Sequence, residues 1–463
     1  MINQKVLLGR TFDSTPRITP KRKLIADRKM LPVNLPIGGD EFWMENESHL
    51  MTVAPTGAGK GRSVIIPNLL TYPGSIVVTD PKGENFAVTA RARREMGHTV
   101  IRLDPFHVID GESDALNPLD LFKLPGSDVE TDSQMIADLL SLRTSFNDFW
   151  ENCAYSFLSG VVGYIAALGK SDPNDLTFTK LWSTCHSDDV VYNLAVVLDT
   201  LENATKKKRK EKKVEQTSDP GAIEQSPITE QPTLSAMAYS EIAAFLQKAD
   251  KERSGVLSTT NSYLNAFGSA EVLKTLDRST VPLTDIIDGK PISIYLIIPP
   301  AKLKSHFTLL RLWIGTILHC ITSRRVIPEY RTLFVLDECA QLGAFPALET
   351  AVTLCRGYGL QVWTFWQDLS QIRTLYPISW PTMINNCGAV QIFGAKNYSV
   401  SSEVAALLGI EPDDVLQLKD DEQIVCLNCE THKIKKVDYL DQSDKLFIGK
   451  FDQNPWHAGK PKV

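Results

Sequence analysis

The chain has 463 residues, which is long for one hydrophobic core and predicts about two or three domains. With 43% apolar and 22% charged residues, the composition is that of a globular protein and excludes a disordered or fibrous one. The net charge of -6 excludes a globally basic nucleic-acid-binding protein, so any DNA contact must come from a local basic patch or from oligomer geometry.

Residues 1–48 contain many Pro, Lys and Arg residues without a clear period, which predicts an extended N-terminal lead-in. The opening sequence has no apolar segment of a secretory signal, and the most apolar run, at 157–169, is shorter than the roughly 20 residues that cross a bilayer. The eight cysteines have no framework spacing, which is typical of a reducing compartment. We therefore expect a cytosolic chain.

From His49 onward, short apolar runs alternate with helical patterns. Strands are predicted over 49–54, 75–80 and 98–104, and helices over 62–72 and 85–97. Pro67 is expected to distort the first of these helices near its start. The alternation predicts a parallel sheet covered on both faces.

The pattern is helical between 108 and 279, where β-branched alternation is scarce. Helices are predicted over 132–144, 148–169, 188–203 and 235–249. We predict an all-α domain over 108–279 with a disordered loop at 203–233, which is charged, then polar and proline-rich. The basic run at 206–213 is either a solvated loop or a DNA contact.

Strand signals return after residue 280. Strands are predicted over 292–298, 331–338, 360–368 and 388–395, with a long amphipathic helix over 306–325. Residues 49–107 and 280–463 are therefore predicted to form one discontinuous α/β domain. Near the end of this domain, Cys426, Cys429 and His432 have the side chains of a metal site. No second ligand pair is nearby, so a strand and turn is the preferred interpretation.

The sequence APTGAGKG follows the first of these α/β strands. Phosphate-binding loops point backbone N–H groups inward at the head of a helix and need glycines for close approach. Ala54 replaces the first Gly of the general motif, and Gly61 replaces the Ser or Thr that binds Mg²⁺. Lys60 is placed to reach the β- and γ-phosphates. The predicted nucleotide-binding residues are Thr56, Gly57, Ala58, Gly59, Lys60, Gly61 and Arg62.

Two acidic residues end the apolar run LFVLDE. A phosphate-binding loop needs such a carboxylate at the end of another buried strand. Asp337 is predicted to hold Mg²⁺ through water, and Glu338 to polarise the attacking water. Gln367 ends the next strand and is either a γ-phosphate sensor or a strand-end cap. Asp80 also directly follows an apolar strand. Two interpretations are open for it: a catalytic role or a place in a purely structural loop.

Taken together, these segments resemble the type IV secretion coupling proteins, the TraG-like conjugation ATPases related to the FtsK–HerA DNA translocases. The resemblance covers nearly the whole chain and rests on APTGAGKGRSVIIPNLL, VVTDPKGENFAVTARAR, DALNPLD, DFWENCAYSFL, IYLIIPPAKL, LFVLDECAQLG, CRGYGLQVWTFWQDLSQI and LFIGKFDQNPWH. The family usually has GKG in its loop, so Gly61 matches it. Ser63 or water then becomes the candidate Mg²⁺ ligand.

The resemblance implies a RecA-like domain with an inserted all-α domain, ATP and Mg²⁺ as cofactors, and a homo-hexameric ring with ATP between subunits. A monomer is the alternative for the isolated chain. Arg356 lies where the family has an arginine finger; a surface arginine is the other interpretation. The family normally begins with transmembrane helices, so three alternatives are open: the anchor was removed, it lies on a separate protein, or the chain is a soluble subtype. Membrane attachment is expected only through a missing or separate anchor.

Three functions follow from this resemblance. The first is an ATP-driven coupling protein that delivers DNA–relaxase or effector substrates to a type IV secretion channel at the cytoplasmic face of the bacterial inner membrane. The second is a free cytosolic DNA translocase. The third is a substrate receptor with weak or no ATP hydrolysis, which the set Lys60, Asp337, Glu338 and Gln367 disfavours.

Overall fold

A computed structural model describes residues 4–12, 39–141, 143, 148–200, 233–441 and 443–457. The chain divides into two compact units. Unit 1 comprises Met1–Asp114, Thr284–Phe307 and Ile317–Val463, and unit 2 comprises Ala115–Leu283 and Thr308–Thr316. The basic run at 206–213 and residues 203–232 of the predicted loop lie outside the described residues.

The described part of unit 1 contains one eleven-stranded sheet in the order β2-β1-β11-β10-β9-β3-β8-β7-β4-β6-β5. The strands are β1 (Val6–Arg10), β2 (Glu41–Met44), β3 (His49–Val53), β4 (Ile76–Thr79), β5 (Thr99–Leu103), β6 (Ile292–Leu296), β7 (Thr332–Leu336), β8 (Leu360–Trp366), β9 (Cys387–Ile392), β10 (Glu422–Leu427) and β11 (Glu430–Lys435).

Strands β9, β3, β8, β7, β4, β6 and β5 form the parallel part of this sheet. The central strands β3, β4, β6, β7 and β8 are buried along their whole length. Such strands are covered on both faces, which explains their continuous apolar sequences. Parallel pairing places Val53 beside Trp366 and Leu336 beside Thr364, so the loops after β3, β7 and β8 leave the same edge.

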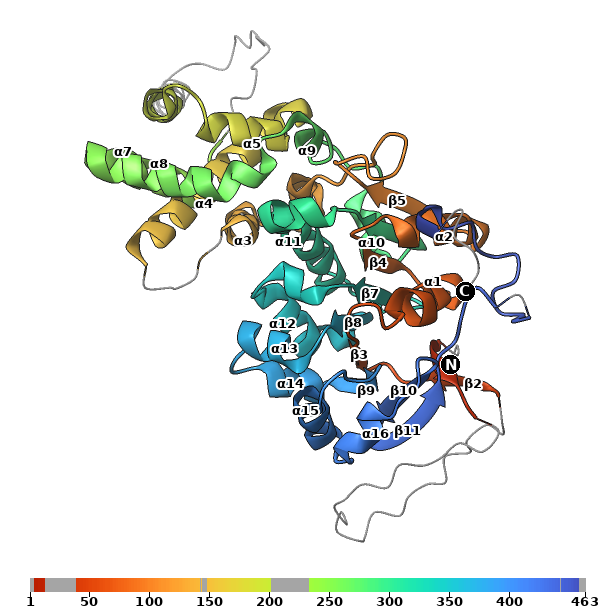
Figure 1. Ribbon diagram of the computed structural model, residues 1–463. Helices are drawn as coiled ribbons and strands as arrows, with labels where there is room; N and C mark the ends of the chain where they lie inside the picture. Colours follow the sequence, from red (N-terminus) through yellow and green to blue (C-terminus); the bar gives the residue numbers. More distant parts are fainter. Residues whose placement is uncertain are drawn as a thin grey trace. The chain divides into compact units, whose positions relative to one another are not determined.

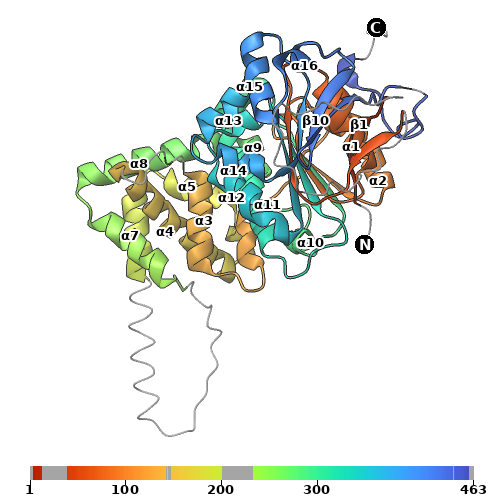
Figure 2. The same ribbon diagram turned by 90° about the horizontal axis from the view of Figure 1, so that it is seen from below.

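The other part of the sheet is antiparallel and differs from the prediction. The predicted lead-in contributes β1 and β2, and Arg10 pairs with Lys435 of β11. Figure 2 shows β1, from the start of the chain, close to β10 from its end. Residues 6–10 and 41–44 of the predicted lead-in are therefore strands of the sheet, which the sequence interpretation did not assign because each run is too short to show a period. The pairing of β10 with β11 confirms the predicted strand and turn around Cys426 and Cys429.

Helices cover both faces of the sheet (Figure 1). On one face are α1 (Ile66–Thr71) and α2 (Glu84–Glu95), and on the other are α12 (Pro346–Leu354), α13 (Leu369–Leu375) and α14 (Trp380–Asn385). Unit 1 also contains α15 (Tyr398–Leu408) and α16 (Pro412–Leu416). Helix α10 (Leu283–Ile287) belongs to unit 1 as well, apart from Leu283, which is counted with unit 2. The predicted distortion at Pro67 is confirmed, since a π-type turn at Gly61–Ile65 precedes α1.

The described part of unit 2 contains helices and no strand. They are α3 (Val129–Leu140), α4 (Phe149–Ser171), α5 (Phe178–Cys185), the helix Val190–Thr200, α7 (Ala236–Gln247), α8 (Asp250–Leu264) and α9 (Ala270–Lys274). Helix α11 (Pro300–Thr322) passes from unit 1 into unit 2 just after a kink at His306. Unit 2 begins at Ala115 and ends at Leu283, where the sequence predicted limits of 108 and 279, and it also includes Thr308–Thr316 of α11.

Helix α4 forms the centre of unit 2. It packs against α3, α7 and α8, and its Gly163 leaves so little room that an added Cβ would lie 2.8 Å from Ala238 Cβ. Among the described residues, α4 alone has the length and mean hydropathy of a membrane-crossing helix, and 61% of its most apolar window is buried. Buried core helices of water-soluble domains meet the same criterion.

Candidate nucleotide-binding site

The glycine-rich loop joins β3 to the helical turn that precedes α1. The backbone N–H of Ala54, the first residue of the loop, donates a 2.9 Å hydrogen bond to Trp366 O, which fixes the loop to the end of β8. Gly57 and Gly59 have φ angles of 83° and 86°, which a residue with a Cβ adopts only with strain. A 2.9 Å hydrogen bond from Ser63 N to Gly59 O closes the first helical turn. The loop thus has the backbone that an anion site at a helix start requires.

Lys60 extends from this loop to the two acidic residues after β7. Its Nζ lies 2.9 Å from Asp337 Oδ1 and forms a shorter ion pair with Glu338 Oε1. Burial acts to lower the pKa of Lys60, but the two carboxylates outweigh it and raise that pKa. Burial raises the pKa of Asp337, and the Lys60 ammonium opposes this effect. The lysine and both carboxylates therefore form one coupled charge cluster.

The backbone at Glu338 is left-handed, with φ 53° and ψ 49°. This conformation is uncommon for a residue with a side chain and costs on the order of 1 kcal/mol. It turns the chain sharply after β7, and Glu338 N donates to Asp337 Oδ1 at 3.0 Å. Gln367 Nε2 donates to Glu338 Oε2 at 3.0 Å. Lys60, Asp337, Glu338 and Gln367 are thus brought together at one edge of the sheet.

Asp80 follows β4 beside this cluster and is buried. Its carboxylate accepts a 2.9 Å hydrogen bond from Phe86 N, close to the start of α2, which favours the structural interpretation of this loop. The neighbouring Thr79 Oγ1 donates to Asp337 O at 2.9 Å, so the loop also supports the chain next to Glu338. Burial raises the pKa of Asp80 to about 7.

This pKa shift predicts a pH-dependent stability. The folded pKa of Asp80 is about 7 against an ordinary 3.8, so the unfolded chain releases this proton at lower pH than the folded chain. The contribution of Asp80 to stability therefore falls as pH rises between these two values and is constant above them. Asp80→Asn keeps an acceptor oxygen without the charge. We expect its melting temperature, relative to wild type, to rise between about pH 4 and 7. A constant difference across that range would contradict this assignment.

The donor set fits a magnesium ion that is held mainly by phosphates and water. Asp337 and Glu338 supply carboxylate oxygens, and the buried Ser63 supplies a hydroxyl two residues after Gly61, which has no side chain. Among the described residues, no group of three or more His, Cys, Asp or Glu side chains forms a closed metal site. Mg²⁺ commonly binds through one or two carboxylates, substrate phosphates and water, which agrees with this sparse set.

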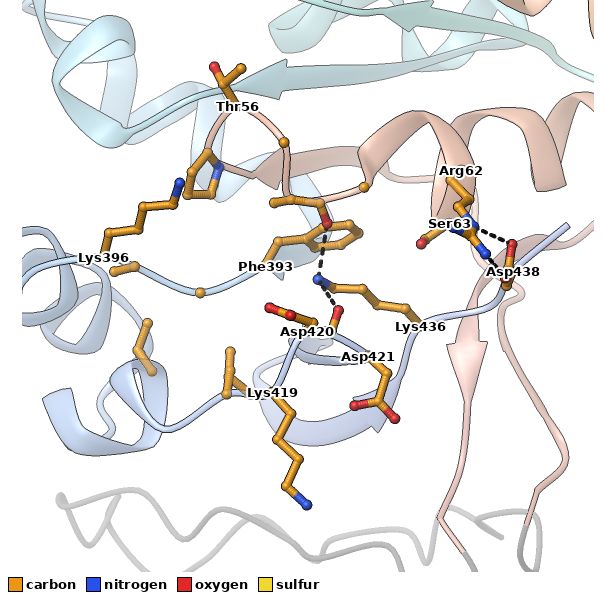
Figure 3. A pocket seen from close by; sticks show the side chains of 18 of the residues that line it. Thr56, Arg62, Ser63, Phe393, Lys396, Lys419, Asp420, Asp421, Lys436 and Asp438 are labelled. Carbon is orange, nitrogen blue, oxygen red and sulfur yellow. Dashed lines mark hydrogen bonds and ion pairs between the residues drawn. The ribbon is translucent and has the colours of Figure 1, made fainter. Parts of the chain in front are cut away.

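A cavity of about 600 Å³ lies on the β9 side of the loop (Figure 3). One wall is the loop itself, including Thr56, Gly57, Ala58 and Gly59 with the following Arg62 and Ser63. The other wall comes from the C-terminal part of the chain: Phe393, Lys396, Val415, the segment 418–421 and the segment 436–438. Arg62 is paired with Asp438 across the cavity rim.

Arg356 lies at the other edge of the sheet. It precedes the amino end of β8, whereas the loop follows the carboxyl end of the adjacent parallel strand β3. The seven residues of β8 separate these ends by about 20 Å. The Arg356 side chain is exposed, and its backbone carbonyl accepts a 2.7 Å hydrogen bond from Arg331. Arg356 is therefore not part of the cluster around Lys60.

The sequence interpretation did not identify the C-terminal wall of the cavity. Strand β9 was expected from its apolar run, but Phe393 directly after it gave no separate signal. Lys419, Asp420, Asp421 and Lys436 occur in polar segments typical of solvated loops. No local pattern could have placed them beside a loop more than 300 residues earlier in the chain.

Two features together define a P-loop domain of the RecA-like class. One is the glycine-rich loop between β3 and a helix, and the other is the pair of carboxylates directly after β7. The solved structure of the plasmid coupling protein TrwB in complex with ADP and Mg²⁺ has this fold, with a TM-score of 0.63, 16% identity, and coverage of 97% of this chain and 98% of TrwB.

The family model described as "Type IV secretory system Conjugative DNA transfer" matches residues 14–409, and the chain belongs to this family. It is 25% identical to the conjugal transfer protein TraG of Escherichia coli, over 73% of this chain and 51% of TraG. It is 26% identical to protein VirD4 of Rhizobium rhizogenes, over 88% of this chain and 60% of VirD4. The chain thus spans about half the length of the TraG protein.

Proposed function

We propose that this protein is an ATPase of the coupling-protein type, which uses ATP hydrolysis to deliver DNA–relaxase or effector substrates to a type IV secretion channel. The observation that carries this proposal is the cluster in which Lys60 contacts Asp337 and Glu338 while Gln367 contacts Glu338. Membership in the conjugative DNA transfer family supports the transport role. Its place of action would be the cytoplasmic face of the bacterial inner membrane.

The nucleotide would lie along the edge where β7, β8, β3 and β9 end. Its phosphates would bind to residues 56–62, with the γ-phosphate near Lys60 and Gln367. The nucleoside would occupy the cavity beside Phe393, which has room for it. Mg²⁺ would be held by Asp337, through water, and by Ser63. The complex of TrwB with ADP and Mg²⁺ supports this choice of ligands.

Hydrolysis would proceed by attack of water on the γ-phosphate. Glu338 would accept a hydrogen bond from this water and orient it, while Gln367 would hold the Glu338 carboxylate and sense the phosphate. In the structure the Lys60 ammonium occupies the position between the two carboxylates. On binding ATP, Lys60 would exchange this contact for the β- and γ-phosphates, which frees both carboxylates for metal and water.

Arg356 would act on a neighbouring copy in a homo-hexameric ring. Its exposed side chain and its position at the opposite edge from the loop support this role, because it cannot reach the nucleotide of its own chain. An arginine supplied by a neighbour stabilises charge on the transferred phosphoryl group and makes hydrolysis depend on assembly. The helical unit is our candidate for cargo recognition.

The proposal predicts DNA-stimulated ATP hydrolysis. Phosphate release would be measured with Mg-ATP, with and without single- or double-stranded DNA, and again after Mg²⁺ is chelated. We expect DNA to raise the rate several-fold and chelation to abolish it. If the protein binds ATP but never hydrolyses it, including when it is held as a hexamer, the receptor function replaces the proposed one.

A further inference from the structure

Lys436 links the phosphate-binding loop to the C-terminal part of the sheet (Figure 3). Its Nζ donates hydrogen bonds to the backbone oxygens of Ala58, at 3.1 Å, and of Asp420, at 3.0 Å. The same ammonium lies 4.3 Å from the centroid of the Phe393 ring. One side chain therefore contacts the loop, the segment before β10 and the residue after β9.

The contact at Ala58 controls one peptide of the loop. The Ala58 carbonyl and the Gly59 N–H belong to a single planar trans peptide, so they point in opposite directions. This peptide rotates about ψ of Ala58 and φ of Gly59, and glycine accepts both signs of φ, so the sequence alone allows the peptide to rotate. The hydrogen bond from Lys436 selects the orientation in which the carbonyl faces the cavity and the Gly59 N–H faces away from it.

The surroundings of Lys436 distinguish this contact from an ordinary surface ion pair. Both of its hydrogen-bond acceptors are neutral backbone carbonyls, and no ion pair of Lys436 is present in the described part of the chain. Hydrogen bonds from a charged donor are about twice as strong as neutral ones. The backbone N–H of Lys436 also donates to Asp421 O at 2.7 Å, which holds the base of the side chain.

We propose that Lys436 is a positioning residue for the phosphate-binding loop, which holds the Ala58–Gly59 peptide with its N–H directed at the phosphates of the nucleotide. This inference rests on the nucleotide-binding function proposed above. Lys436 acts through the loop and does not touch the reacting atoms. Phosphate affinity thus depends on a residue directly after β11 as well as on the loop.

The test compares three variants of the full chain. Lys436→Met removes the donor and keeps most of the side-chain volume, Lys436→Arg keeps a charged donor, and Lys435→Met alters the exposed neighbour, which does not line the cavity. Calorimetry would measure the binding of ADP and of inorganic pyrophosphate. We expect Lys436→Met to weaken both ligands by the same factor, roughly tenfold. Lys436→Arg should remain within about threefold of wild type, and Lys435→Met should be unchanged.

Two binding results would overturn the inference. Unchanged affinity in Lys436→Met would show that the loop does not need this contact. Weaker ADP binding with unchanged pyrophosphate binding would show that Lys436 contacts the nucleoside directly.

Hydrogen–deuterium exchange of the ligand-free protein provides a readout that does not need a nucleotide. Amides of residues 54–62 should exchange faster in Lys436→Met than in wild type or Lys435→Met, while those of α2 remain unchanged. Equal exchange in this segment would contradict the positioning role. If wild type binds neither ADP nor pyrophosphate, the proposed function fails, and the exchange comparison still decides the role of Lys436.

Discussion

Replacing Glu338 with glutamine is expected to stop ATP hydrolysis while ATP remains bound. The variant keeps the size of the side chain and an acceptor for Gln367, but loses the charge that orients and polarises the attacking water. Loss of a positioned general base typically costs about 10²- to 10⁴-fold in rate. Binding should be unchanged or tighter, because one negative charge is removed close to the γ-phosphate.

Single-turnover hydrolysis and equilibrium binding of ATP, measured on the same preparation, separate these effects. Lys60→Ala should lose both binding and hydrolysis, since the ammonium would contact the phosphates in the ground state. Glu349→Gln, a similar change on α12 away from the cluster, should behave as wild type. A Glu338→Gln variant that hydrolyses ATP at the wild-type rate would remove Glu338 from the mechanism and leave Asp337 as the candidate base.

Most of the cluster around Lys60 could be predicted because its residues follow buried parallel strands. Each of these strands is an apolar run: β3 is followed by the glycine-rich loop, β7 by two acidic residues and β8 by the amide of Gln367. Parallel pairing then brings these ends to one edge, whatever their distance in sequence. The parallel α/β sheet with an inserted helical domain follows from the same interpretation of strand and helix patterns, whereas the RecA-like class was implied by the family resemblance.

The pairing of β1 with β11 could not be predicted, because these two strands lie at opposite ends of the chain. Arg10 pairs with Lys435, and β1 is too short to show a period. The contact of Lys436 with Ala58 was hidden for the same reason. In the sequence HKIKKVD, Lys436 cannot be distinguished from a solvent-exposed lysine. Only the tertiary structure places its ammonium against the loop.

Replacing Arg356 with alanine is expected to lower the rate of ATP hydrolysis about 10³-fold or more, with little change in ATP affinity. The arginine would meet the nucleotide of a neighbouring copy only as charge builds in the transition state, so ground-state binding does not depend on it. Arg356→Lys should recover only a small part of the rate, because a lysine lacks the planar fork that matches phosphate oxygens.

A mixing experiment distinguishes a role between subunits from a role within one chain. Arg356→Ala subunits keep an intact Lys60, and Lys60→Ala subunits keep an intact Arg356, so a mixed ring contains some complete sites. Each variant alone should be inactive under conditions in which wild type assembles, and mixing them should restore part of the hydrolysis. If each variant assembles and the mixture stays inactive, Arg356 does not act on a neighbour. Recovery would show that one subunit contributes the loop and its carboxylates while the next contributes the arginine, as its position at the far edge of the sheet requires.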